Sequence, residues 1–193
     1  KIRVIGVSNF GTQDGQDMLK LGRYETNQLP YSLLWRAVEF DIQPQCVDEN
    51  ISILPYSPLN QALLTGKYKN ADEMPHSRTR TRHFSGDRQN SKHGLPGYEV
   101  ELFETLEAIQ KICDDINQSM VHVALAWLLQ QSAVSSVLAG ARNPEQVHSN
   151  VAAANLSLSQ ETVDRLDAVT DDLKQKFGSN PDMWQNDANT RYR

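Results

Sequence analysis

The sequence predicts an α/β fold built on a parallel sheet. Short apolar runs of strand length alternate with helical segments through the first third of the 193 residues, at the spacing of strand–helix–strand units. The stretch Ile51–Lys67 supports this class, because an apolar run there ends in Pro55-Tyr56-Ser57-Pro58 and feeds a loop closed by Gly66-Lys67. Loops with an aromatic ring, a hydroxyl and a lysine at a strand's carboxyl end often carry chemistry in α/β proteins, although many are ordinary connectors.

The composition restricts the class of protein. Hydrophobic residues make up 39% and charged residues 22% of the chain, and the net charge is −5, as in ordinary soluble domains. This mild acidity disfavours a broad nucleic-acid-binding surface, and no apolar run approaches the ~20 residues that a membrane helix needs. The two cysteines, Cys46 and Cys113, are too few for a disulfide framework and fit reduced thiols in a cytoplasmic protein.

The predicted elements begin with a strand at the start of the chain. Because Lys1 leads directly into a β-branched run, we expect sequence of the same fold to precede it. Prolines fix φ and lack an N–H, so the third strand is expected to end before Pro55. The elements in order are a strand over Ile2–Val7, a helix over Gln16–Gly22, a strand over Thr26–Leu29, a helical turn over Trp35–Phe40, a short helix from Pro44 to Asn50 and a strand over Ile51–Leu54.

Residues 69–97 form the longest irregular stretch of the sequence. A loop of this length in a compact domain is usually functional or disordered. Its segment Ser77–His83 alternates arginine and threonine, and it either lies in solvent, as charge runs usually do, or clamps a phosphate with guanidinium groups. The histidines His76, His83 and His93 lack the spacing of a zinc site, so no metal is predicted.

The second half of the chain carries the strongest helical patterns. Apolar residues recur at three- and four-residue steps over Glu99–Ile116, so one face of that helix is expected to be buried. Residues 1–178 form the predicted domain, with 179–193 as its tail. The remaining predicted elements are a helix capped by Ser119, a fourth strand over Ser135–Ala139, a helix from Pro144 to about Ala154, a helix capped by Ser159 that ends near Gly178, and a polar tail docked by Met183 and Trp184.

One predicted helix start is also a candidate anion site. Asn143 is a good N-cap, Pro144 suits the first helical position, and Gln146 completes a pair similar to a capping box. Arg142 precedes this N-terminus, where backbone N–H groups and the helix dipole favour negative charge. Simple capping explains the same residues, and the two interpretations are compatible.

Four motifs in order resemble one known family. They are I-G-V-S-N (5–9), N-Q-L-P-Y (27–31), Y-S-P-L (56–59) with L-L-T-G-K (63–67), and G-A-R-N-P-E-Q-V (140–147). Together they resemble the aldo-keto reductases, in particular the bacterial group related to the potassium-channel β-subunit. The resemblance implies a TIM-type (α/β)8 barrel that binds NADPH without a Rossmann fold. The chain looks like the C-terminal half of that barrel, strands five to eight with their helices, since a whole barrel needs about 250 residues.

The resemblance implies cofactor-binding roles for thirteen residues, all toward NADP(H). The positions matched to the nicotinamide are Ser8, Asn9, Gln28 and Tyr56. Those matched to the pyrophosphate and its neighbouring phosphate are Ser57, Leu59, Gln61, Lys67 and Arg78. Those matched to the adenosine 2′-phosphate and adenine are Gly140, Arg142, Gln146 and Asn150. An arginine beside a helix N-terminus favours NADP over NAD, because both stabilise a dianionic phosphate.

The resemblance also implies what this chain lacks. The family's proton donor is a tyrosine assisted by a lysine, an aspartate and usually a histidine, and no segment here matches them, so no catalytic residue is predicted. The parent protein is expected to reduce small aldehydes or ketones to alcohols. This chain alone is expected to be inactive, and to need the missing half or a second copy. Two alternatives stay open: a non-catalytic NADP-sensing interaction module like a channel β-subunit, and a half-barrel assembly piece.

Overall fold

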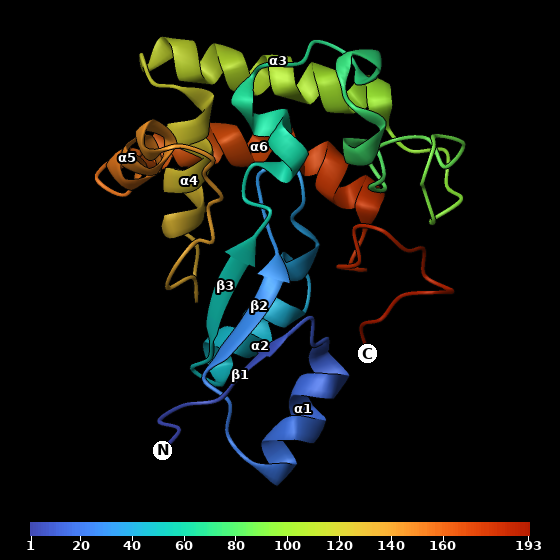
Figure 1. The fold of residues 1–193 in the computed structure, drawn as a ribbon. Helices are drawn as coiled ribbons and strands as arrows, with labels where there is room; N and C mark the ends of the chain where they lie inside the picture. Colours follow the sequence, from blue (N-terminus) through green and yellow to red (C-terminus); the bar gives the residue numbers. More distant parts are fainter.

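A computed structural model describes residues 1–193, and the first third of the chain forms one parallel sheet. Its strands are β1 (Gly6–Ser8), β2 (Thr26–Pro30) and β3 (Ser52–Tyr56), in the spatial order β1-β2-β3. Figure 1 shows β2 and β3 directed toward two long helices, α3 (Glu99–Asp115) and α6 (Gln160–Phe177), which pack on each other. The predicted α/β class with a parallel sheet is confirmed.

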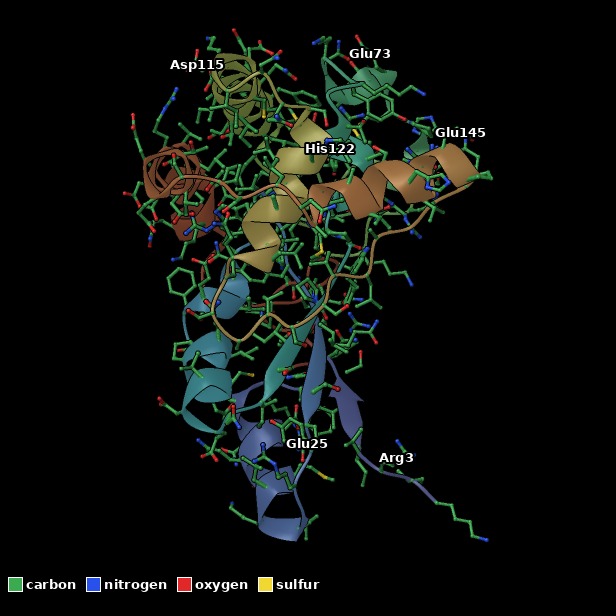
Figure 2. All side chains as sticks on the ribbon, turned by 90° about the vertical axis from the view of Figure 1, so that its left-hand side faces the viewer. Arg3, Glu25, Glu73, Asp115, His122 and Glu145 are labelled. Atoms are coloured by element: carbon green, nitrogen blue, oxygen red, sulfur yellow. The ribbon has the colours of Figure 1, made fainter.

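β1 is shorter than the sequence predicts. The expected strand over Ile2–Val7 is wrong before Gly6, and the side chain of Ile2 stands in solvent, with the residue 82% exposed. β1 pairs only with β2, and the register begins with Gly6 opposite Thr26. Earlier residues have no strand beside them, and Figure 2 shows Arg3 on a segment that extends away from the sheet.

β3 continues through Pro55, where the sequence predicts that it ends. The register pairs Leu29 with Pro55 and Pro30 with Tyr56. A proline loses only its donor, and its carbonyl oxygen still accepts hydrogen bonds. One residue further on, the N–H of Tyr31 donates to the Tyr56 carbonyl oxygen over 3.3 Å. The strand therefore carries Tyr56 to the carboxyl edge of the sheet.

The predicted fourth strand over Ser135–Ala139 is wrong. The segment runs beside β3, where Ile53 donates to the Ala133 carbonyl oxygen over 2.7 Å and Leu138 donates to the Pro55 carbonyl oxygen over 2.9 Å. Pro55 has no N–H to donate in return, so the regular pattern of a parallel ladder is interrupted. Only an isolated bridge to Ile53 forms.

The helices lie close to their predicted positions. The three predicted caps are confirmed, because the side chains of Ser119, Asn143 and Ser159 each accept from a backbone N–H in the first turn of the next helix. The short helix predicted from Pro44 begins two residues earlier. No helix combines the length and the apolar character needed to cross a bilayer. The remaining helices are α1 (Thr12–Leu21), η1 (Ala37–Glu39), α2 (Ile42–Asp48), η2 (Asn60–Thr65), η3 (Ala71–Glu73), η4 (His76–Arg78), α4 (Met120–Leu129) and α5 (Pro144–Ala153).

Helix α1 begins at Thr12, four residues before the predicted start at Gln16. Its N-cap, Gly11, has no side chain to cap the helix. The carbonyl oxygen of Arg193 instead accepts from the N–H groups of Gln13 (2.9 Å) and Asp14 (3.2 Å). The far end of the chain thus satisfies donors that a helix leaves unpaired at its N-terminus.

The loop 69–97 is more buried than its polar sequence predicts. Arg82 belongs to the arginine–threonine run, yet its side chain is buried beside Trp35, with 5.4 Å between the guanidinium carbon and the ring centroid. It donates to the Phe177 carbonyl oxygen over 3.0 Å. The solvated interpretation is therefore wrong for Arg82, whose guanidinium joins the loop to the end of α6. Arg80 remains exposed.

A buried ion cluster connects the segment after β2 to α6. Arg36 donates to both carboxylate oxygens of Glu39, each over 2.8 Å. Lys174 of α6 and the Tyr31 hydroxyl each reach the same carboxylate at 2.8 Å. Burial alone raises the pKa of the Glu39 carboxyl, but the hydrogen bonds from Arg36 and the charges around it leave that pKa below its ordinary value.

The tail packs against the domain. Met183 is buried, as the sequence predicts, and its carbonyl oxygen accepts from the Arg82 N–H over 2.8 Å. Asp182 is fully buried and bound by the guanidinium of Arg191 through two hydrogen bonds of 2.8 and 3.1 Å. These contacts hold the end of the tail near the carboxyl edge of the sheet. The division of the chain at residue 178 stays a prediction.

Candidate functional site

The ends of the three strands bring four predicted site residues together. The Ser8 hydroxyl and the Asn9 N–H both donate to the Gln28 carbonyl oxygen, over 3.2 and 3.0 Å. The Tyr56 hydroxyl donates to Asn9 Oδ1 over 2.9 Å. Asn9 itself has φ of 60°, a left-handed conformation that asparagine tolerates better than most residues. We call Ser8, Asn9, Gln28 and Tyr56 the strand-end cluster.

A fifth residue, Tyr192, joins the strand-end cluster from the tail. Its hydroxyl donates to Asn9 Oδ1 over 2.6 Å, so this oxygen accepts from two tyrosines. Burial raises the pKa of both the Tyr56 and the Tyr192 hydroxyl, so both hold their protons at neutral pH. With Oδ1 occupied, Asn9 keeps its Nδ2 donor for a ligand, and the Gln28 side-chain amide makes no hydrogen bond within the protein.

The ring of Tyr56 lies next to Trp184 of the tail. The two ring centroids are 6.2 Å apart and the rings are within 13° of parallel. The sequence pointed to Trp184 only as a residue that docks the tail, while nothing in the sequence pointed to Tyr192. Both come from a segment about 130 residues beyond Tyr56.

The loop after β3 and the start of α5 enclose one cavity. Its volume is about 480 Å³, and its lining includes seven predicted residues: Ser57, Leu59, Gln61, Gly140, Arg142, Gln146 and Asn150. Ser57, Asn60, Gln61 and Ala62 all have positive φ, between 42° and 71°. Non-glycine residues adopt this conformation at a cost in energy, and such strain often clusters at functional sites. We call this space the α5 cavity.

Hydrogen bonds fix the wall of the α5 cavity formed by α5. Asn143 Oδ1 accepts from the Gln146 N–H over 2.9 Å, and Gln146 Oε1 accepts from the Arg142 N–H over 2.9 Å. Asn150 Nδ2 donates to the Gly140 carbonyl oxygen over 3.3 Å. The guanidinium of Arg142 is exposed and has no ion pair. Figure 2 shows this end of α5, marked by Glu145, projecting from the body of the protein.

The chemistry of the α5 cavity fits a phosphorylated nucleotide. No aspartate or glutamate contributes to the lining, whereas Arg142 and the amide residues Gln146 and Asn150 do. An arginine guanidinium stabilises an anion, and amides provide donors and acceptors for a base. No group of three or more histidine, cysteine or acidic side chains is placed to hold a metal ion.

Two predicted residues lie outside both sites. Lys67 is exposed, and its ammonium lies 5.6 Å from the centroid of the Tyr68 ring. Arg78 donates to the Tyr68 hydroxyl over 3.2 Å. Neither side chain lines the α5 cavity, so the structure brings eleven of the thirteen residues into two sites and leaves these two around Tyr68.

Comparison with known proteins identifies the family. A model of the "Aldo/keto reductase family" matches residues 1–171. The chain belongs to the aldo/keto reductase family. Its resemblance to these reductases is thereby confirmed at the family level.

Individual relatives are longer proteins, and the chain aligns with only part of each. It is 37% identical over 159 residues to the NADH-specific methylglyoxal reductase of Escherichia coli (strain K12), covering 82% of this chain and 46% of that protein. It is 27% identical over 181 residues to an aldo-keto reductase of Schizosaccharomyces pombe (strain 972) named yakc, whose name specifies NADP(+), covering 90% of this chain and 50% of that protein.

A solved structure confirms the same partial match. The glycerol dehydrogenase AKR11B4 from Gluconobacter oxydans superposes with a TM-score of 0.71 at 29% sequence identity, covering 88% of this chain and 49% of that one. The chain therefore spans about half the length of the curated relatives it matches. This α/β structure with three parallel strands matches about half of an aldo/keto reductase barrel.

Proposed function

We propose that the chain is the NADP(H)-binding half of an aldo/keto reductase that reduces aldehydes or ketones to alcohols. The observation that carries the proposal is the α5 cavity. Its lining brings together seven predicted residues that lie up to 93 positions apart in the sequence, and it contains no aspartate or glutamate. Such a site suits the phosphates and adenine of the cofactor. The strand-end cluster suits the nicotinamide, and it adjoins the α5 cavity because its member Tyr56 precedes Ser57 of the cavity lining.

In this proposal each residue has a positioning role. Asn9 Nδ2 and the Gln28 amide hold the nicotinamide carboxamide, and Tyr56 stacks on the ring and sets which face is presented. The Tyr192 hydroxyl fixes the orientation of the Asn9 amide by donating to its oxygen. When bound, the reduced nicotinamide supplies a hydride to the substrate carbonyl carbon.

The proton for the product alcohol comes from outside this chain. A general acid works best when its pKa lies near the working pH. Burial raises the pKa of Tyr56 and of Tyr192, the two tyrosines whose hydroxyls meet at the strand ends, so neither suits the role. The tyrosine, lysine, aspartate and histidine of the family therefore belong to the part of the barrel that this chain does not match.

We assign the chain to the C-terminal half of the barrel, with strands five to eight as the counterpart. The order of the four motifs supports this assignment. An apolar groove of about 360 Å³, lined among others by Leu129, Val137 and Val151, and the unpaired edge of β1 are surfaces that the missing half, or a second copy, would cover. Two unpaired, buried cysteines support a cytoplasmic location.

The alternatives predict cofactor binding without turnover. A sensing module of the channel β-subunit type and a half-barrel assembly piece would both hold NADP(H) in the α5 cavity. Turnover of a small aldehyde by the natural full-length protein separates the reductase from both, because a sensor or assembly piece would bind NADPH and leave the aldehyde unchanged.

The cofactor proposal is tested by the nicotinamide fluorescence of NADPH and NADH titrated with the full-length protein. We expect tighter NADPH binding, and we expect Arg142→Gln to weaken NADPH about tenfold while leaving NADH unchanged, since one charge-assisted contact is worth about 1.5 kcal/mol. Arg3→Gln, which removes an exposed arginine far from the cavity, is the matched control. A preference for NADH, or equal loss for both cofactors in Arg142→Gln, would contradict the role of Arg142.

A further inference from the structure

A second pocket opens beside the strand-end cluster. Its volume is about 380 Å³, and it is lined by Tyr56, Arg80, Asn90, Lys92, Trp184, Gln185 and Arg191. It shares no residue with the α5 cavity: Tyr56 faces this pocket, and the next residue, Ser57, faces the other. Because Tyr56 lines this pocket and is also proposed to stack on the nicotinamide, one end of a substrate held here would lie beside the nicotinamide site. We call it the basic pocket.

We propose that the basic pocket recognises the anionic end of the substrate, so that the preferred carbonyl compounds carry a carboxylate or a phosphate. The inference rests on the proposed function and narrows its substrate class. The charges of the lining carry the inference. The lining contains three basic residues and no acidic one, although the chain as a whole has a net charge of −5.

Two of the three cations are available to a ligand. Arg80 and Lys92 are exposed, and neither makes an ion pair or a hydrogen bond within the protein. Arg191 is held by the buried carboxylate of Asp182, and its guanidinium carbon lies 5.9 Å from the Trp184 ring centroid. Arg191 therefore shapes the wall, while Arg80 and Lys92 leave the pocket with two uncompensated positive charges.

The shape of the basic pocket orients such a molecule. Its aromatic side, made by Tyr56 and Trp184, suits the carbon skeleton, and its basic side suits the anion. Arg80 and Lys92 both come from the long loop 69–97, so this loop acquires a role in substrate choice. Charged partners also raise the rate of encounter with an anionic substrate.

The test measures binding to the full-length protein loaded with NADP+, so that no reduction occurs. Calorimetric dissociation constants are compared for two pairs of aldehydes: 4-oxobutanoate against butanal, and glycolaldehyde phosphate against glycolaldehyde. We expect the charged member of at least one pair to bind roughly tenfold tighter at low salt, and the advantage to shrink as ionic strength rises. The two pairs distinguish a carboxylate site from a phosphate site.

Variants attribute the preference to the pocket. Arg80→Gln and Lys92→Gln remove exposed charges that make no ion pair or hydrogen bond within the protein, so folding should be unaffected, and each should reduce the advantage of the anion about threefold. Lys111→Gln, an exposed lysine of α3, is the matched control. Equal affinity for charged and neutral aldehydes, or an advantage that survives the double variant, overturns the inference. NADPH fluorescence titration of the same samples reports separately on the proposed function.

Discussion

Lowering the pH should destabilise the protein through one buried histidine. The ring of His83 is fully buried, between the rings of Trp35 and Phe177 at centroid distances of 5.3 and 4.7 Å. The neutral ring satisfies both nitrogens, since Nε2 donates to the Leu34 carbonyl oxygen over 2.8 Å and Nδ1 accepts from the Thr81 hydroxyl over 3.0 Å. A second proton on the His83 ring would place a positive charge in the core without water to solvate it.

The magnitude follows from the pKa. Burial lowers the pKa of His83 to about 4, against 6.5 for an exposed imidazole. The unfolded chain therefore takes up a proton before the folded protein does, and stability falls as pH drops from about 6.5 to about 4. The difference between the folded and unfolded pKa values lowers the free energy of unfolding by about 2 kcal/mol at pH 5, and by about 3.4 kcal/mol when His83 is protonated in both states.

Urea unfolding at pH 7.5 and pH 5.0, followed by tryptophan fluorescence, measures this loss. His83→Gln keeps a donor and an acceptor but cannot be protonated, so its stability should change about 2 kcal/mol less between the two pH values than that of the wild type. His148→Gln, at an exposed position on α5, serves as the control. If His83→Gln and the wild type lose the same stability on acidification, the reasoning about His83 fails.

Two further changes test the packing. Glu39→Gln removes the carboxylate whose two oxygens bind the buried Arg36 guanidinium and leaves only Asp167, at 3.5 Å, as an ion-pair partner. The free energy of unfolding should fall by about 3 kcal/mol, against little change for Glu107→Gln on the exposed face of α3; a loss below about 1 kcal/mol would contradict this. Gly11→Ala places a methyl group against the Arg193 carbonyl oxygen, so the amides at the start of α1 should exchange faster with deuterium; unchanged exchange would show that this carbonyl does not cap the helix.

What the sequence could predict was set by local physics. The caps at Ser119, Asn143 and Ser159 depend on a side chain and a backbone N–H three residues apart, and all three are confirmed. The four residues of the strand-end cluster were assigned through the family motifs. Their spatial proximity follows from parallel strands, whose carboxyl ends meet at one edge of the sheet.

The predictions that were wrong depended on distant partners. Pro55 ends no strand because β3 stays paired with β2 through Tyr56, a long-range pairing that no local pattern encodes. The same proline interrupts the ladder with the segment predicted as a fourth strand. Arg82 is buried because Trp35 and α6 surround it. In each case a tertiary contact outweighed the preference of the local sequence.

The bond between Tyr192 and Asn9 has a consequence for folding. It joins residues 183 positions apart, so forming the bond requires closing a long loop, which costs conformational entropy. Because synthesis proceeds from the N-terminus, Asn9 is made 183 residues before the second tyrosine that binds it. The strand-end cluster is therefore completed only after Tyr192 has been synthesised, and a nascent chain that stops before the tail would carry an Asn9 amide that Tyr192 does not yet orient.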